Sequence, residues 1–164
     1  MHMLLDLYHG TSNKIIDVLK KNNAYDRNSV NIENAVFATT RKRKAVYFGI
    51  RSCLINSTCI CKLDNRRIFI SSLRSNIAKR VFIYKVDPSS FVLDAKDEYK
   101  SDKDVRILSV EEYSLEQAIK EYGFEIYLVP KIDSNMTIHE QIKQMNNFIE
   151  NENFQKLDIT AMTQ

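Results

Sequence analysis

The sequence contains few residues that interrupt regular structure and few that could cross-link a fold. Three glycines and two prolines occur in 164 residues, tryptophan is absent, and the three cysteines are odd in number. No apolar run approaches the roughly 20 residues that cross a bilayer. The chain's start lacks the basic region, apolar core and cleavage site of a secretory signal. We therefore expect a cytoplasmic protein with reduced thiols, no membrane segment and no metal centre.

The composition is that of a globular protein. Hydrophobic residues make up 44% of the chain and charged residues 27%, a balance that excludes a disordered chain. A chain of this length can bury roughly two-thirds of the surface that its unfolded form exposes. Because no repeat or linker is visible, we expect one domain spanning residues 1–164.

Charge is distributed unevenly along the chain. Residues 38–85 carry twelve basic side chains and one acidic side chain, whereas residues 86–164 carry eight basic and sixteen acidic ones. The formal net charge of +3 hides this segregation. It predicts a polyanionic partner, such as a nucleic acid or a nucleic-acid-bound protein, for the middle of the chain. The alternative is that the basic and acidic segments neutralise each other in the fold.

Hydrophobic periodicity and turn residues predict short strands mixed with helices. The expected strands are residues 3–8, 35–39, 57–63, 67–73, 80–86, 105–110 and 124–129. The expected helices are residues 13–22, a helix starting at Thr40, residues 114–122 with Ser114 as cap and Gly123 as stop, and residues 137–152. A helical turn within residues 71–79 is left open, residues 94–104 are expected to form a loop, and residues 153–164 a frayed tail. This mixture indicates an α+β fold.

The helix starting at Thr40 carries the basic residues Arg41 to Lys44 in its first turn. Since the helix macrodipole is positive at this end, four cations there are unfavourable without an anion nearby. The same run is also typical of a solvated face or of a nucleic-acid contact.

The segment Tyr8-His9-Gly10-Thr11 ends an apolar stretch where the chain is expected to reverse. A histidine at such a point can face a cleft, and Gly10 permits close backbone approach. Alternatively, the histidine only bonds its own turn.

Two later segments give this motif a context: Val36-Phe37-Ala38-Thr39, followed by Ala45 and Tyr47, and then Asp97-Glu98-Tyr99. In this order the three segments resemble the ADP-ribosyltransferase superfamily, specifically its diphtheria-toxin and poly(ADP-ribose) polymerase branch. The resemblance implies split mixed and antiparallel sheets with flanking helices, and NAD⁺ as co-substrate.

The resemblance also implies roles for individual residues. His9 would bond the adenosine ribose, backbone groups of Gly10 would hold the nicotinamide amide, Tyr47 would stack on nicotinamide, and Glu98 would be the catalytic glutamate. The other expected NAD-binding residues are Thr11, Phe37, Ala38, Thr39 and Arg41.

Two positions depart from the family pattern. Val36 occupies the place of the family's usual tyrosine, so either that member of the triad is missing or Phe37 supplies the stacking face. Lys96 stands two residues before Glu98, so the Glu-x-Glu pattern of arginine-modifying relatives is absent and arginine is disfavoured as acceptor.

The chemistry calls for these residue types. Cleaving the bond between nicotinamide and ribose develops oxocarbenium character, and a carboxylate bonded to a ribose hydroxyl stabilises that charge. An aromatic ring fixes the nicotinamide by stacking. Without this function, Glu98 would be a solvated carboxylate in an acidic loop and Tyr47 a core residue.

The leading hypothesis is mono-ADP-ribosylation of a protein or nucleic acid, as in an effector, toxin or counter-defence protein. The other enzymatic hypotheses are an NAD-consuming RNA 2′-phosphotransferase and an NAD glycohydrolase. From a different class, the chain could be an inactive binding or inhibitory module, which the valine at position 36 supports.

Overall fold

The computed structural model describes residues 5–25, 32–56 and 59–162. The chain divides into two compact units, each made of two stretches of sequence. The first unit comprises residues 1–49 and 80–113, and the second comprises residues 50–79 and 114–164. Each unit contains one β-sheet together with helical segments, so the predicted α+β class is confirmed.

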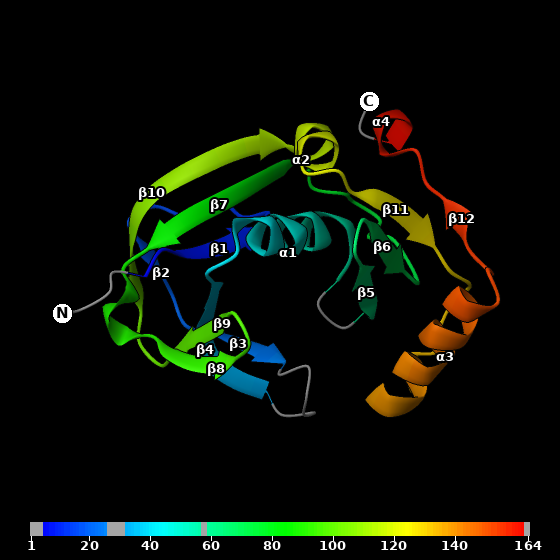
Figure 1. Cartoon of the computed structure of the whole chain (residues 1–164), viewed down its shortest axis with the longest axis horizontal. Helices are drawn as coiled ribbons and strands as arrows, with labels where there is room; N and C mark the ends of the chain where they lie inside the picture. Colours follow the sequence, from blue (N-terminus) through cyan, green and yellow to red (C-terminus); the bar gives the residue numbers. More distant parts are fainter. Residues whose placement is uncertain (1–4, 26–31, 57–58, 163–164) are drawn as a thin grey trace. The chain divides into compact units, whose positions relative to one another are not determined.

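The first unit holds the larger, eight-stranded sheet. Its strands run in the order β2-β10-β7-β1-β4-β9-β8, and β3 pairs with β4 (Figure 1). The described pairings are antiparallel. The strands are β1 (Leu7–Thr11), β2 (Val18–Leu19), β3 (Asn22–Tyr25), β4 (Ile32–Thr39), β7 (Arg80–Val86), β8 (Val92–Ala95), β9 (Glu98–Ser101) and β10 (Val105–Ser114).

Alternation along these strands gives the first unit its core. Side chains two residues apart point to the same face of a strand, so Val36 and Ala38 of β4 join Leu7 of β1 on one face. Further buried members of this cluster are Leu19, Phe82, Tyr84, Val86 and Val105. Burying such side chains contributes about 1.5–3 kcal/mol each before the entropic cost of ordering them.

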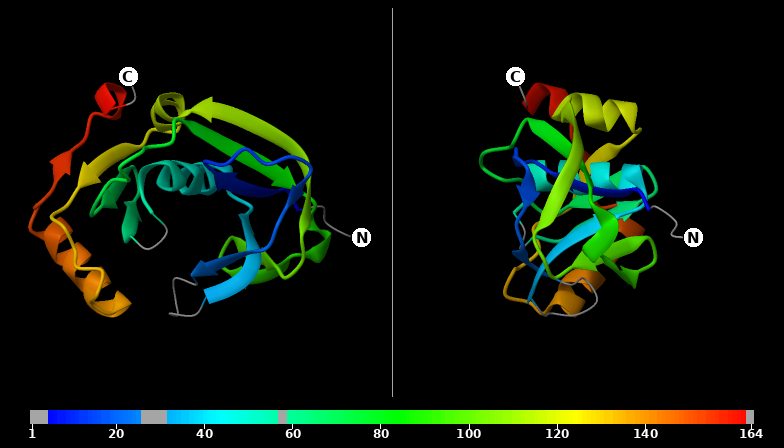
Figure 2. Two further views of the ribbon diagram at one scale, coloured as in Figure 1. Left: turned by 180° about the vertical axis from the view of Figure 1, so that it is seen from behind. Right: turned by 90° about the vertical axis from the view of Figure 1, so that its left-hand side faces the viewer.

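Strands β1 and β4 separate soon after they meet. β1 pairs with β7 along its whole length, from Leu7 to Thr11, but its described register with β4 is the single pair Tyr8 and Thr39. Beyond this pair β4 runs away from β1, as both views of Figure 2 show. The described pairing between these two strands therefore ends just before His9.

Helix α1 (Lys42–Leu54) starts three residues after β4 ends, and the unit boundary falls inside it. The Thr39 hydroxyl accepts a hydrogen bond from the backbone N–H of Arg41 (3.1 Å) just before the helix. α1 lies so close to β1 that a Cβ at Gly10 would stand 1.7 Å from the carbonyl oxygen of Ala45. Gly10 thus permits the helix to contact the strand directly.

The second unit holds the four-stranded sheet, in the order β12-β11-β6-β5. β6 and β11 run parallel, while the other two pairs are antiparallel. Its strands are β5 (Cys61–Asp64), β6 (Arg67–Ile70), β11 (Glu125–Leu128) and β12 (Gln155–Lys156), and its complete helices are α2 (Leu115–Glu121), α3 (Ile138–Glu150) and α4 (Ile159–Met162). Phe69, Val129, Ile132 and Met145 form the buried centre of this unit.

The helices expected over residues 114–122 and 137–152 are confirmed with slightly shifted ends. Ser114 caps α2 by accepting from the N–H of Gln117 (3.0 Å), and Gly123 with φ 70° follows its end. Thr137 caps α3 in a capping box with Glu140. The strand expected at residues 80–86 is confirmed as β7, and those at 35–39, 67–73, 105–110 and 124–129 are confirmed with shifted ends. Residues 3, 4, 57 and 58 of two further expected strands lie outside the described residues.

The expected helix over residues 13–22 is wrong. The segment instead forms a turn, the short strand β2 and the start of β3. The hydroxyl of Tyr84 accepts from the N–H of Ile15 (2.6 Å) and donates to the carbonyl of Asn13 (3.1 Å), and Asp17 adopts φ 67°. These backbone groups are taken by a distant side chain, so the local apolar spacing does not decide the structure.

Two further expectations are corrected. The loop expected over residues 94–104 contains β9, which pairs with β8 in a hairpin, so Glu98 lies on a strand. The tail expected to fray from residue 153 contains β12 and α4, with residues 163–164 outside the described part. The ring of Phe154 lies 5.1 Å from that of Phe69, which ties this tail to the core of its unit. Residues 71–79 contain no helical turn.

Among the described residues, the helices fall short of the length and apolar character that crossing a membrane requires.

Candidate functional site

The three segments that the sequence singles out lie on neighbouring strands of the first unit. β4 stands between β1 and β9, and one row crosses all three strands through Tyr8, Thr39 and Glu98. The backbones of β1 and β9 are therefore about 10 Å apart at this row, which is two strand spacings. Segments separated by up to 90 residues of chain thus lie on neighbouring strands.

His9 lies where the described pairing between β1 and β4 ends. Its Nδ1 lies 2.7 Å from the carbonyl oxygen of Phe37. The imidazole thus bonds a backbone carbonyl of β4 in place of a backbone N–H of β1. Since a carbonyl can only accept, Nδ1 carries the hydrogen. Burial lowers the pKa of the imidazole from its ordinary value of 6.5, although the bond to Phe37 raises it in part. In the neutral ring that results, Nε2 is an acceptor.

Glu98 begins β9 opposite Thr39. Its Oε1 is 2.9 Å from Nζ of Lys44 on α1, and both side chains are about one-quarter exposed, at 28% and 27%. The carboxylate therefore belongs to a partly shielded ion pair and remains partly exposed to solvent.

Phe37 and Glu98 share one face of the sheet. Phe37 pairs with Lys100, so Glu98 is its diagonal neighbour on β9, a relation that spans about 7–8 Å. Phe37 is half-buried. This face brings an accessible aromatic ring and a carboxylate within reach of one small ligand.

The other expected aromatic and its neighbours are covered. Tyr47 is only 1% exposed and its ring centroid lies 5.3 Å from that of Phe48, so neither face of Tyr47 is open to a ligand. Val36 is 3% exposed, and both Val36 and Ala38 belong to the core cluster. Strand alternation also directs the side chain of His9 toward the face of Leu7, which is the face of the sheet opposite to that of Glu98.

The remaining expected cofactor residues lie at the ends of the same elements. Thr11 is buried, and its hydroxyl accepts from the N–H of Asn13 (3.2 Å). Thr39 is buried beneath the start of α1. Arg41 lies 3.9 Å from a carboxylate oxygen of Asp97, in the turn that precedes Glu98.

The anion expected near the start of α1 is supplied by the chain. Arg41, Lys42 and Lys44 contact the carboxylates of Asp97, Glu111 and Glu98, respectively. Three ion pairs thus offset the unfavourable placement of cations at a positive helix end. Lys44 contacts Glu98 but is not among the site residues predicted from the sequence. The sequence did contain a signal for this contact. Arg41 and Lys44 are three residues apart and so lie on one side of the helix, where they can pair with the adjacent acids Asp97 and Glu98.

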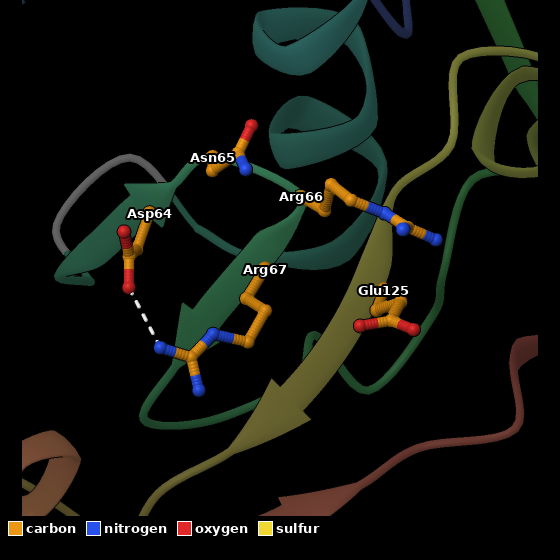
Figure 3. Close-up of a pocket in the computed structure, with 5 residues that line it drawn as sticks. All are labelled: Asp64, Asn65, Arg66, Arg67 and Glu125. Atoms are coloured by element: carbon orange, nitrogen blue, oxygen red, sulfur yellow. Dashed lines mark hydrogen bonds and ion pairs between the residues drawn. The ribbon is translucent and has the colours of Figure 1, made fainter.

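A separate pocket of about 290 Å³ lies in the second unit (Figure 3). It is lined by Asp64, Asn65, Arg66, Arg67 and Glu125. Arg67 donates to Asp64 (2.7 Å), while Tyr127 and Lys156 contact the two oxygens of Glu125. None of these residues is a predicted site residue. Asp64 and Arg67 pair with each other, whereas the partners of Glu125 lie outside the lining.

No family model matches the chain, and a search of curated proteins found no match.

Proposed function

We propose that the chain is an NAD-dependent mono-ADP-ribosyltransferase that modifies a macromolecular target. The observation that carries this proposal is the adjacency of β1, β4 and β9: Phe37 and Glu98 share one face of the sheet, and His9 bonds the Phe37 carbonyl from the neighbouring strand. NAD⁺ is the expected co-substrate.

In this proposal His9 is an acceptor for a ribose hydroxyl. Its Nδ1–H is committed to the Phe37 carbonyl, which fixes the ring and leaves Nε2 as the acceptor. The hydroxyl of the adenosine ribose is the matching donor. Backbone groups of Gly10, the next residue, would hold the nicotinamide amide.

Glu98 stabilises the charge that develops when the bond between nicotinamide and ribose breaks. One carboxylate oxygen is held by Lys44, and the other bonds no described residue, so it can accept from a ribose hydroxyl. An ionised carboxylate so placed favours the oxocarbenium-like transition state. The freed nicotinamide leaves, and ADP-ribose passes to the acceptor.

Phe37 is the better stacking residue of the two aromatic candidates. It is half-buried on the face of Glu98, whereas Tyr47 must become uncovered before its ring can stack on anything. The proposal therefore assigns nicotinamide stacking to Phe37 and retains Tyr47 only if NAD⁺ binding exposes its ring.

A second candidate is an inactive module of the same fold that binds a partner. The buried valine at position 36 and the covered ring of Tyr47 favour it, because both occupy places where the family positions aromatic rings around nicotinamide.

Release of nicotinamide from NAD⁺, with and without cell lysate, separates the two candidates. In the proposed enzyme, Glu98→Gln lowers turnover by about 10²–10³ while the fold is preserved, since one transition-state contact is lost. Glu111→Gln is the matched control, because Glu111 also pairs with a lysine of α1 but lies on β10. Equal rates for the wild type and Glu98→Gln would remove Glu98 from the mechanism. If the wild type releases no nicotinamide and gains no thermal stability with NAD⁺, the binding module is favoured.

A further inference from the structure

The carboxylate of Glu98 is held from outside its own strand. Nζ of Lys44, in the first turns of α1, lies 2.9 Å from Glu98 Oε1. Both residues belong to the first unit, and about three-quarters of each side chain is shielded from solvent. A partly shielded pair is screened less by salt than one that is fully exposed.

The turn before Glu98 is tied to the same helix start. The N–H of Thr40 donates to the carbonyl of Asp97 (3.2 Å), and Arg41 approaches the Asp97 carboxylate (3.9 Å). Asp97 itself adopts φ 61°, a left-handed conformation that a non-glycine residue rarely keeps without support. Three contacts from residues 40–44 therefore fix both the backbone and the side chain at the start of β9.

We propose that Lys44 is a positioning residue for Glu98, an inference that rests on the function proposed above. Lys44 holds Oε1, so the carboxylate plane is set before the substrate arrives and Oε2 is presented to the ribose hydroxyl. A glutamate has three rotatable side-chain bonds, and ordering them beforehand removes that entropic cost from the catalytic step. Lys44 does not need to contact the sugar.

This role predicts a particular kinetic pattern. Replacing Lys44 by methionine keeps an apolar stem and removes the charge, so Glu98 must be ordered in each turnover. We expect kcat to fall by about tenfold to a hundredfold, the range typical of lost support behind a functional ligand, with KM nearly unchanged. Lys44→Arg keeps a donor and a charge and should restore most of kcat.

The matched control is Lys42→Met. Lys42 lies two residues before Lys44 and pairs with Glu111 on β10. The variant therefore removes a similar ion pair from the same helix start. Its kcat should equal that of the wild type. If Lys44→Met and Lys42→Met lower kcat equally, the loss comes from weakening α1 and the inference is overturned.

A double variant tests whether Lys44 acts through Glu98. Adding Lys44→Met to Glu98→Gln should cause no further loss of kcat, because the group that Lys44 positions is already disabled. Losses that multiply would overturn the inference while leaving Glu98 in the mechanism. An active wild type with full kcat in Lys44→Met would also overturn it and leave the proposed function intact. A wild type that releases no nicotinamide would withdraw both.

If Lys44→Met does not fold, the comparison of Lys44→Arg with Lys44→Gln tests the inference, since only arginine preserves the charge.

Discussion

The imidazole of His9 has one nitrogen in a structural hydrogen bond and a second nitrogen, Nε2, that can accept one. The Nδ1–H bond to Phe37 replaces a strand contact at the point where β1 and β4 part, and the lowered pKa keeps Nε2 unprotonated near neutral pH. Protonation of this residue therefore favours the unfolded chain, in which the imidazole takes up a proton more readily.

The free energy of unfolding should decrease as the pH falls below about 6.5. In the unfolded chain the imidazole binds a proton near pH 6.5, whereas burial in the folded chain holds its pKa lower. In that window the unfolded state binds more protons, so acid favours unfolding. Urea denaturation from about pH 8 to pH 5 measures this slope, and His9→Asn, whose amide can still donate to Phe37, should flatten it.

The control for this titration is His139→Gln, since His139 is exposed on α3 and should leave the slope unchanged. Lowered carboxyl pKa values belong to a different window. Hydrogen bonds from Ser89 and Lys21 hold the pKa values of Asp87 and Asp104 below 3.8, so their stabilisation is lost only under stronger acid. A slope that His9→Asn leaves intact would show that His9 is not its source.

At the scale of elements, α1 and β1 are held in direct contact by Gly10. No other residue can stand there without moving the helix, because the Ala45 carbonyl occupies the place of a Cβ. The same contact brings the start of α1, with Lys44, over the row that contains Glu98.

Gly10→Ala should therefore destabilise the first unit by about 1–3 kcal/mol or more, the cost of forcing atoms into a packed site. Thermal unfolding measures the loss. Gly123→Ala is a useful contrast: nothing lies within 4 Å of its Cβ position, and its cost of about 1 kcal/mol would come from φ 70° alone. Equal losses in the two variants would contradict a steric origin at Gly10.

Local signals predicted some elements well and others badly. Ser114 and Thr137 each cap a helix by bonding a backbone N–H three residues ahead, so these starts can be read from the sequence. Residues 13–22 looked helical by spacing, but Tyr84, about 70 residues away, bonds that backbone. Similarly, the tail is ordered by Phe154 against Phe69, a contact that local reasoning cannot supply.

The candidate site was predictable in part for the same reason. Motif order placed His9, Phe37 and Glu98 in one hypothesis, and their strands are neighbours. It could not show that Glu98 lies on a strand, because β8 and β9 carry charged side chains typical of a loop. Nor could it reveal that Tyr47 is buried or that Lys44 contacts Glu98, since both depend on how α1 packs.

At the scale of the whole molecule, the charge segregation along the sequence largely disappears on folding. At least six of the twelve basic residues between 38 and 85 form ion pairs with carboxylates of their own unit: Arg41, Lys42, Lys44, Arg67, Arg80 and Lys85. The first unit has 14 basic and 12 acidic residues, and the second has 10 and 9. Four of these pairs, those of Arg41, Lys42, Lys44 and Arg80, join the basic segment to acids of residues 86–164, so mutual neutralisation accounts for part of the pattern. For the proposed transferase, this favours a protein as the acceptor.

Binding to single-stranded RNA should then be weak and only shallowly dependent on salt. One or two phosphate contacts would lower affinity by about tenfold or less between 50 and 200 mM salt, whereas six to ten contacts would lower it by about 10³–10⁵. Filter binding measures the slope. Arg66→Ala is an informative variant, because Arg66 is exposed and forms no ion pair with a described residue, so it should account for part of any slope that exists.

A second experiment identifies the acceptor by adding labelled NAD⁺ to a cell lysate. The label should persist after nuclease treatment and disappear after protease treatment. A steep salt slope together with nuclease-sensitive label would instead identify a nucleic acid as the acceptor.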